Sequence, residues 1–138
     1  MSKYNNAKTE YMGIIFDSKM EKEYYEYLLG LQKKGLVKRI LLQPVFELQP
    51  SYKKNGKHVR EIKYVADFLV EYKDGTTEVI DIKGMVLSDF KLKMKIFEYK
   101  YPYTLKLITF SKLDGGWITL DELKKARKKR KQLKLSKK

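Results

Sequence analysis

Cysteine is absent from this sequence of 138 residues. Without thiols the chain can form neither disulfides nor a thiolate metal site, and nothing in it calls for an oxidising compartment. Its first ten residues are polar and lack the apolar run of a secretory signal, and no segment approaches the roughly 20 apolar residues of a membrane span. The lone histidine, His58, has no partner for an imidazole metal site. These absences predict a cytoplasmic protein that does not contact a membrane.

The chain is nevertheless suited to folding as one compact domain. Domains commonly contain roughly 100–150 residues, and a core of that size needs no covalent crosslinks. Hydrophobic residues make up 43% of the sequence and aromatic residues 13%, which argues against a disordered adaptor. We find no internal repeat.

Positive charge is concentrated at the carboxyl terminus. The formal net charge is +14, but residues 124–138 contain ten Lys or Arg and no acid, which leaves only +4 for residues 1–123. We therefore expect a domain over residues 1–123 and a basic tail over residues 124–138. Such a tail attracts phosphate backbones without reading sequence, although a solvated, solubilising terminus is the alternative. The candidate DNA contacts in it are Lys124, Lys125, Arg127, Lys128 and Arg130.

The first half of the chain predicts one helix followed by strands. A strand or extended segment over 11–16 leads to Asp17 or Ser18, either of which can cap a helix that runs to about residue 34 and ends at Gly35. The β-prone segment 40–48 contains Pro44, which predicts an edge strand or a bend because proline cannot donate to a ladder. A polar turn over 52–58, a β-prone segment over 59–72, a hairpin turn at Asp74-Gly75 and a strand over 77–83 follow.

The second half predicts a helix, a strand and a further helix. Ser88 or Asp89 can cap a helix that Pro102 ends. A strand over 105–110, a turn over 114–116 and a helix from Leu120 onward complete the chain. The order αβββαβ predicts an α/β fold with a mixed central sheet flanked by helices.

Three charged residues interrupt the two arms of the predicted hairpin. Asp67 lies within an apolar run on the first arm, and Asp81 and Lys83 lie within one on the second. Burying an uncompensated charge costs several kcal/mol, so these positions stand out. Residues on adjacent antiparallel strands can face one another, and residues two apart on a strand share a face. The pattern therefore predicts that the three side chains converge.

Convergence depends on the register of the hairpin. A two-residue turn at Asp74-Gly75 would pair Asp67 with Ile82 and direct the Asp67 side chain away from Asp81. We therefore expect a three-residue loop over 74–76, or a bulge that shifts the register by one residue. A simple two-residue turn would count against the predicted site.

Two neighbouring carboxylates favour a hard divalent cation with oxygen ligands, and Mg²⁺ commonly binds through one or two carboxylates, water and substrate phosphate. Such a cation lowers the pKa of bound water and stabilises charge developing on phosphorus. Lys83 could orient or deprotonate the attacking water or stabilise the pentacovalent phosphate, and the sequence does not distinguish these roles. The alternative is a salt-bridged trio on a solvent-facing sheet.

The motifs together resemble the PD-(D/E)XK nuclease superfamily, in particular its small phage and prophage endonucleases. The resemblance covers roughly residues 11–110 and has one departure, since Ala66 replaces the proline of the first motif. The segments that carry it are Phe16-Asp17-Ser18-Lys19, Tyr64-Val65-Ala66-Asp67-Phe68, Val79-Ile80-Asp81-Ile82-Lys83-Gly84 and Lys95-Ile96-Phe97-Glu98-Tyr99-Lys100-Tyr101-Pro102.

The resemblance implies that Asp67 and Asp81 bind the metal and that Lys83 is the catalytic lysine. The metal is expected to be Mg²⁺, with Mn²⁺ able to substitute, and no small-molecule cofactor is expected. Many members add a glutamate from the first helix, for which Glu21 is our choice and Glu23 the competitor, because helical periodicity does not decide between them.

The residues and the resemblance predict a metal-dependent DNA endonuclease. The resemblance further implies a phage-encoded enzyme that acts on branched or structured DNA, such as a Holliday junction, during recombination or DNA processing in a bacterial host. Lys91, Lys95 and His58 are further candidate DNA contacts, although solvated lysines are the commoner outcome. Cutting two strands calls for two sites, so we expect a homodimer. The rival interpretations are a non-catalytic nucleic-acid-binding module on the same fold and a structural protein.

Overall fold

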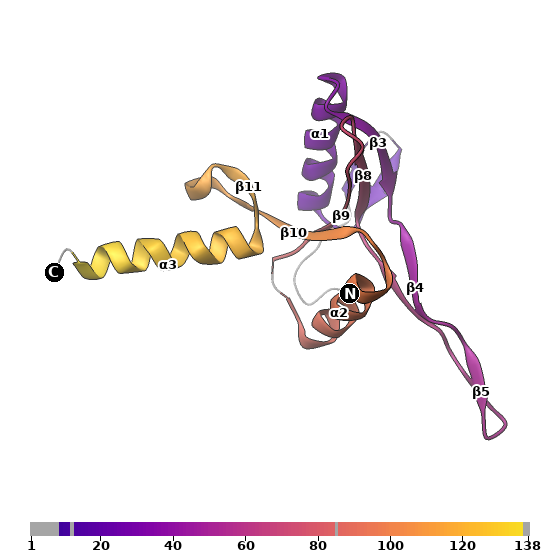
Figure 1. The fold of residues 1–138 in the computed structure, drawn as a ribbon. Helices are drawn as coiled ribbons and strands as arrows, with labels where there is room; N and C mark the ends of the chain where they lie inside the picture. The colour runs from indigo at the N-terminus through magenta and orange to yellow at the C-terminus, as the bar shows by residue number, and fades with distance from the viewer. Residues whose placement is uncertain (1–8, 12, 85, 137–138) are drawn as a thin grey trace.

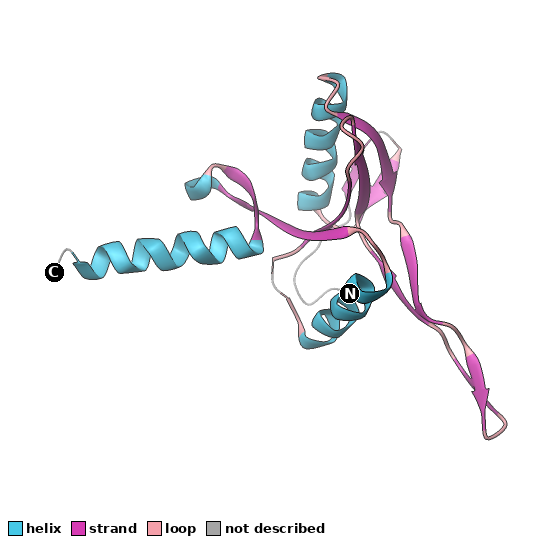
Figure 2. Ribbon diagram, viewed as in Figure 1, coloured by secondary structure: helices cyan, strands magenta, loops and turns pink. Residues whose placement is uncertain are grey.

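The computed structural model describes residues 9–136, except residues 12 and 85, and has the predicted α/β fold with a mixed sheet flanked by helices (Figures 1 and 2). In chain order the elements are β1 (Thr9–Tyr11), β2 (Ile14–Phe16), α1 (Lys19–Lys33), β3 (Val37–Leu42), β4 (Val45–Gln49), β5 (Tyr52–Lys54), β6 (Lys57–Val59), β7 (Ile62–Val65), β8 (Phe68–Tyr72), β9 (Thr77–Ile82), α2 (Ser88–Lys100), β10 (Thr104–Ser111), the 3-10 helix η1 (Lys112–Asp114), β11 (Gly116–Thr119) and α3 (Leu120–Ser136).

The central sheet has five strands in the order β11-β10-β9-β8-β3. Strands β9 and β10 are parallel, because α2 carries the chain from one to the other, and the remaining pairs are antiparallel. Helices α1 and α2 pack against opposite faces of this sheet, and each covers its own cluster of buried side chains.

Helix α1 begins and ends where the sequence predicts. The Ser18 hydroxyl accepts the Glu21 N–H at 3.1 Å, a cap that typically contributes about 1 kcal/mol, and Gly35 follows the helix with φ of 80°. The apolar face of α1 buries Leu28 completely and Tyr24 almost completely against β3, β8 and β9. Burying a leucine contributes roughly 1.5–3 kcal/mol, so this face anchors α1 to the sheet.

Helix α2 begins one residue earlier than expected. Neither Ser88 nor Asp89 is the cap: Leu87 occupies that position without a side-chain hydrogen bond, and Ser88 is already helical. The Asp89 carboxylate accepts the adjacent Phe90 N–H at 2.9 Å, so it acts inside the first turn. Phe97 is fully buried beneath α2, and the helix ends before Pro102 as predicted.

The two ends of the domain contain strands that the sequence pattern did not separate. Residues 11–16 are not one strand, because Gly13, with φ of 79°, lies between β1 and β2, which pair as a hairpin. Strand β11 was not predicted, because Gly115 and Gly116 suggested only a turn. Its Trp117 packs edge-on against Tyr24 of α1 at 4.9 Å between ring centroids, and this aromatic contact places β11 on the sheet edge.

The segment with Pro44 bends, as predicted. It forms two strands, the edge strand β3 and then β4, separated at Gln43-Pro44. Beyond this bend, β4 pairs with β7 and β5 pairs with β6. Residues 52–58, which the sequence predicted as a polar turn, therefore form the end of a long two-stranded ribbon that projects from the domain (Figure 2). We call residues 45–65 the arm.

Helix α3 also projects from the domain (Figure 1). It is held by buried Leu123 near its start and by an ion pair between Arg130, further along the helix, and Asp114. The boundary expected between residues 123 and 124 falls inside this continuous helix. Within the part of the chain that the structure describes, no helix is both long and apolar enough to cross a membrane.

Candidate active site

The β8–β9 hairpin has the register that the predicted site requires. Phe68 pairs with Ile80 and Val70 with Glu78, and continuing this register by one residue places Asp67 opposite Asp81. The turn is not a simple two-residue turn. The Tyr72 N–H bonds to the Thr76 carbonyl at 2.8 Å, so the loop has three residues, Lys73 to Gly75, one position earlier than the predicted loop over 74–76.

Asp67 and Asp81 form a close acidic pair at the end of the hairpin. The Ile82 N–H donates to Asp67 Oδ2 at 2.7 Å, and the Tyr64 hydroxyl donates to Asp81 Oδ2 at 2.5 Å. Burial, followed by the charge of Asp81 and a hydrogen bond with it, raises the pKa of Asp67 above its ordinary value. The two carboxyl groups therefore favour sharing a proton or a cation.

Lys83 extends from the same strand, two residues after Asp81. Its Nζ lies 3.7 Å from Asp81 Oδ2 and 4.4 Å from the centre of the Phe90 ring on α2. The Lys83 N–H donates to the Ile108 carbonyl of β10 at 2.9 Å, which holds its backbone in line with β9. The ammonium is therefore positioned by a carboxylate, an aromatic face and the neighbouring strand.

Helix α1 brings Glu21 to the same site. Burial is the main cause that raises the pKa of Glu21 from 4.5 to about 7, with smaller contributions from the negative charges of Asp17 and Asp81 and an opposing one from Lys83. The negative charge of Glu21 in turn contributes to raising the pKa of Asp67. Glu23, the competing acid, is exposed. The coupling of Glu21 with Asp67 and Asp81 favours Glu21 over Glu23 as the helix acid of the site.

A divalent metal would be held by Asp67 and Asp81. Among the described residues no group of three or more acids or histidines already has the spacing to hold a metal ion. Mg²⁺, however, commonly uses only one or two carboxylates together with water and substrate phosphate. Burial and then the charge of Asp81 raise the pKa of Asp67, and a cation relieves the repulsion between the two carboxylates as well as a proton does. The pair therefore fits a hard cation whose remaining ligands are water and substrate phosphate.

Two contributors to the site were not predicted from the sequence. Tyr64, the donor to Asp81, is 3% exposed, and the charge and hydrogen bonding of Asp81 add to burial in raising its pKa. Phe90 supports Lys83. Both have the pattern of ordinary core residues, so no signal in the sequence distinguished them from packing.

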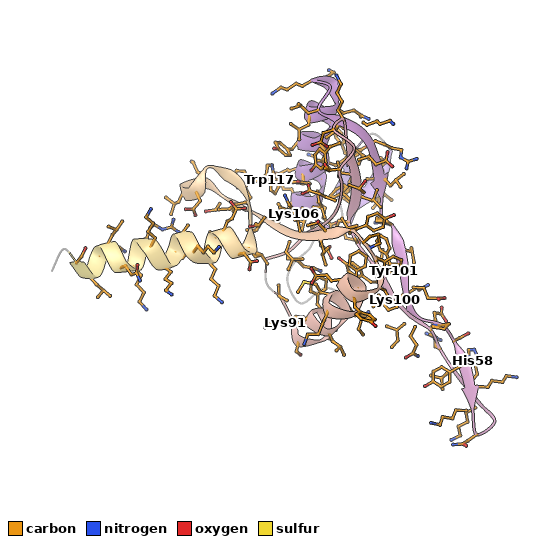
Figure 3. All side chains as sticks on the ribbon, in the orientation of Figure 1. His58, Lys91, Lys100, Tyr101, Lys106 and Trp117 are labelled. Carbon is orange, nitrogen blue, oxygen red and sulfur yellow. The ribbon has the colours of Figure 1, made fainter. Side chains whose placement is uncertain are left out.

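The other predicted DNA contacts are spread over three elements (Figure 3). Lys91 and Lys95 are exposed on α2 and His58 is exposed on the arm, well away from Lys91. On α3 Lys124, Lys125, Arg127 and Lys128 are exposed, whereas Arg130 pairs with Asp114. These residues are therefore not one patch.

Fold and site together define an α/β domain with a close acidic pair, a lysine and a helix glutamate at one end of its sheet. Residues 1–121 match the family described as "Protein of unknown function (DUF1064)", and the chain belongs to that family. The match ends where α3 begins. No curated protein and no solved structure matches the chain.

Proposed function

We propose that this protein is a metal-dependent DNA endonuclease of the PD-(D/E)XK type that hydrolyses phosphodiester bonds. The observation that carries the proposal is the convergence of Asp67, Asp81 and Lys83 from two strands, with Asp67 opposite Asp81 and Lys83 Nζ 3.7 Å from Asp81. A structural salt bridge would need only one carboxylate for one ammonium. The additional acids, Asp67 and Glu21, call for further positive charge, which a divalent cation supplies.

Each residue has a distinct task in this proposal. Asp67 and Asp81 hold Mg²⁺, or Mn²⁺ in its place, and the cation supplies Lewis acidity at the phosphate and lowers the pKa of bound water. The Tyr64 hydroxyl and the Ile82 N–H orient the two carboxylates through the Oδ2 atoms. Lys83 donates hydrogen bonds to the attacking water or to the phosphate oxygens.

Glu21 has a pKa of about 7, which suits a group that accepts a proton near neutral pH. It stands beside the hairpin at the start of α1, where it can take the proton that the attacking water loses. Its raised pKa follows from burial beside other acids, so binding of a cation would lower it and favour the basic form.

The substrate we propose is branched DNA, such as a four-way junction, processed during recombination of phage DNA in the cytoplasm of a bacterial host. One domain of this size leaves little room for reading bases, so recognition of backbone and shape is the simpler mode. Symmetric cutting of two strands requires two sites, which a homodimer provides.

The test is cleavage of linear, nicked and four-way-junction DNA by the purified protein in Mg²⁺, Mn²⁺ or EDTA. We expect cleavage only with metal and strongest on the junction. Asp81→Ala should abolish cleavage while DNA binding is kept or improved, because a repulsive carboxylate is removed. Asp121→Ala, at an exposed position at the start of α3, is the matched control and should cleave as the unaltered protein does.

The rival proposal is a nucleic-acid-binding module without catalysis, for which the exposed cations of α3 are the specific observation. It predicts metal-independent binding and no cleavage of any of the three substrates. Equal cleavage by the unaltered protein and by Asp81→Ala would exclude the acidic pair as the catalytic site.

A further inference from the structure

The end of the arm, residues 50–60, is a two-stranded ribbon with little core of its own. Residues 50–58 are all exposed, although their side chains alternate between the two faces of the ribbon. A ribbon that belonged to the sheet would bury one face, and an isolated hairpin is only marginally stable in water. Both faces of this segment are therefore open to a partner (Figure 2).

The charge of this segment is of one sign. Residues 50–60 contain four Lys or Arg and no acid. Lys54 is directly opposite Lys57, and Lys53 is directly opposite His58. Like charges at opposed positions destabilise a strand pair, and within the described residues no ion pair involves residues 50–60. A bound polyanion would relieve the repulsion between Lys54 and Lys57.

The root of the arm, by contrast, is fixed to the domain. Lys100 Nζ donates to the Glu47 and Leu48 carbonyls at 3.2 and 3.3 Å, and the Tyr101 hydroxyl donates to the Glu47 carbonyl at 2.8 Å (Figure 3). Phe46 packs edge-on against Phe97 at 4.8 Å between ring centroids. These contacts with α2 therefore fix the direction in which the arm projects from the domain.

The same ribbon is joined directly to the candidate active site. Tyr64 belongs to β7, the returning strand of the arm, and its hydroxyl bonds to Asp81. Gly56 at the tip precedes Tyr64 by eight positions, which at about 3.3 Å per residue gives a length of about 26 Å. One turn of duplex DNA rises about 34 Å, so the arm spans most of a turn measured from the site.

We propose that the arm is a DNA-gripping element that lies in the major groove of the duplex flanking the cleaved phosphate, with Lys53, Lys54, Lys57 and Arg60 against its phosphates. The proposal deepens the proposed nuclease function and rests on it. The major groove is about 12 Å wide and admits a two-stranded ribbon. Both faces of the ribbon then meet a wall of the groove, which accounts for lysines on each face.

The shape and charge of the ribbon favour DNA over two other partners. The major groove of double-stranded RNA is deep and narrow, so it does not accept a ribbon in this way. Pairing of the arm with the arm of a second copy of the chain would bring four cations against four identical ones. Such a contact would also bury little apolar surface, because Tyr52, 45% exposed, is the one large apolar side chain exposed in residues 50–60.

The experiment measures the affinity of the full chain for a DNA duplex of about two helical turns (about 20 base pairs) at several salt concentrations in EDTA, where cleavage is suppressed. The arm variant carries Lys53→Gln, Lys54→Gln, Lys57→Gln and Arg60→Gln. The control variant makes the same charge change with Lys33→Gln, Lys34→Gln, Lys38→Gln and Lys73→Gln, at exposed positions near the far end of the sheet. Thermal unfolding verifies that both variants keep the fold.

The expected result is a loss of affinity of at least about tenfold for the arm variant. The slope of log affinity against log salt should fall by about 0.9 for each phosphate that the arm no longer neutralises, or by roughly 3–4 for the four cations removed. The control should keep the slope within about one of the unaltered protein. Equal slopes for the two variants would overturn the proposal. So would equal competition by double-stranded RNA, or a change in oligomeric state confined to the arm variant.

The experiments distinguish a wrong arm proposal from a wrong nuclease proposal. If the arm variant binds normally while the unaltered protein still cleaves DNA with Mg²⁺, the arm proposal is wrong and the nuclease function stands. If binding depends on the arm but no DNA is cleaved under any condition, the arm proposal stands for a binding module and the nuclease function is wrong.

Discussion

Replacing Glu21 by glutamine is expected to stabilise the metal-free protein at neutral pH. The folded-state pKa of Glu21 is about 7, raised from 4.5 mainly by burial and then by the charge of Asp17. Folding therefore takes up a proton between these values, and the unaltered protein loses stability as the pH rises through this interval. Glutamine has a similar shape and no charge, so the variant escapes this loss.

The magnitude follows from the size of the pKa change. A difference of about 2.5 in pKa corresponds to about 3 kcal/mol at about 1.36 kcal/mol per unit. Glu21 is partly exposed, and solvent screening reduces the effect to about 1–2 kcal/mol. In a domain of this size that gain raises the Tm by roughly 4–8 °C.

The assay is thermal and urea unfolding in EDTA between about pH 4.5 and pH 8, with Glu23→Gln as the control because Glu23 is exposed two positions along the same helix. The stability gained by Glu21→Gln should grow from near zero at the acidic end to its full value at the alkaline end. If the Glu21→Gln and Glu23→Gln curves coincide over the whole range, Glu21 is not buried beside the acidic pair and the reasoning fails.

Three further predictions concern the site and the core. Mn²⁺ should raise the Tm of the unaltered protein through preferential binding to the folded state, and Asp67→Asn should remove most of that rise; an equal rise in both would contradict the metal assignment. Tyr64→Phe removes the donor to buried Asp81 and should cost about 1–3 kcal/mol in urea unfolding, whereas no change would mean that this hydrogen bond is unimportant. Leu28→Ala, at a fully buried position, should lower the free energy of unfolding by about 2–5 kcal/mol. The control Leu92→Ala, at a position 62% exposed on α2, should lower it by less than about 0.5 kcal/mol. Similar losses in the two variants would refute the packing of α1.

Local signals predicted most of the fold because they act within a few residues. Ser18 and Gly35 bound α1, and Pro44 breaks the strand before the arm, each through its own backbone chemistry. Strand β11 was missed because its place depends on Trp117 packing against Tyr24, a contact between residues far apart in the sequence.

The candidate site was only partly accessible to sequence reasoning. The alternation of β9 placed Asp81 and Lys83 on one face, and the need for a shifted register was correctly stated, although the loop is Lys73 to Gly75. The position of Glu21 relative to the hairpin depends on how α1 packs on the sheet. The hydrogen bond from Tyr64 to Asp81 depends on how the arm packs on the sheet. Hydrophobic periodicity carries no information about either kind of packing.

The rate of Mg²⁺-dependent DNA cleavage by Lys83→Gln tests the central claim most directly. The variant keeps Asp67 and Asp81, so its Mn²⁺-induced rise in Tm should persist, while cleavage falls by about 10²–10⁴-fold because the ammonium donor at the phosphate is removed. Lys73→Gln, at an exposed position in the turn of the same hairpin, should leave the rate unchanged. Cleavage by Lys83→Gln at the rate of the unaltered protein would contradict a site in which two acids and this ammonium act together on a phosphate.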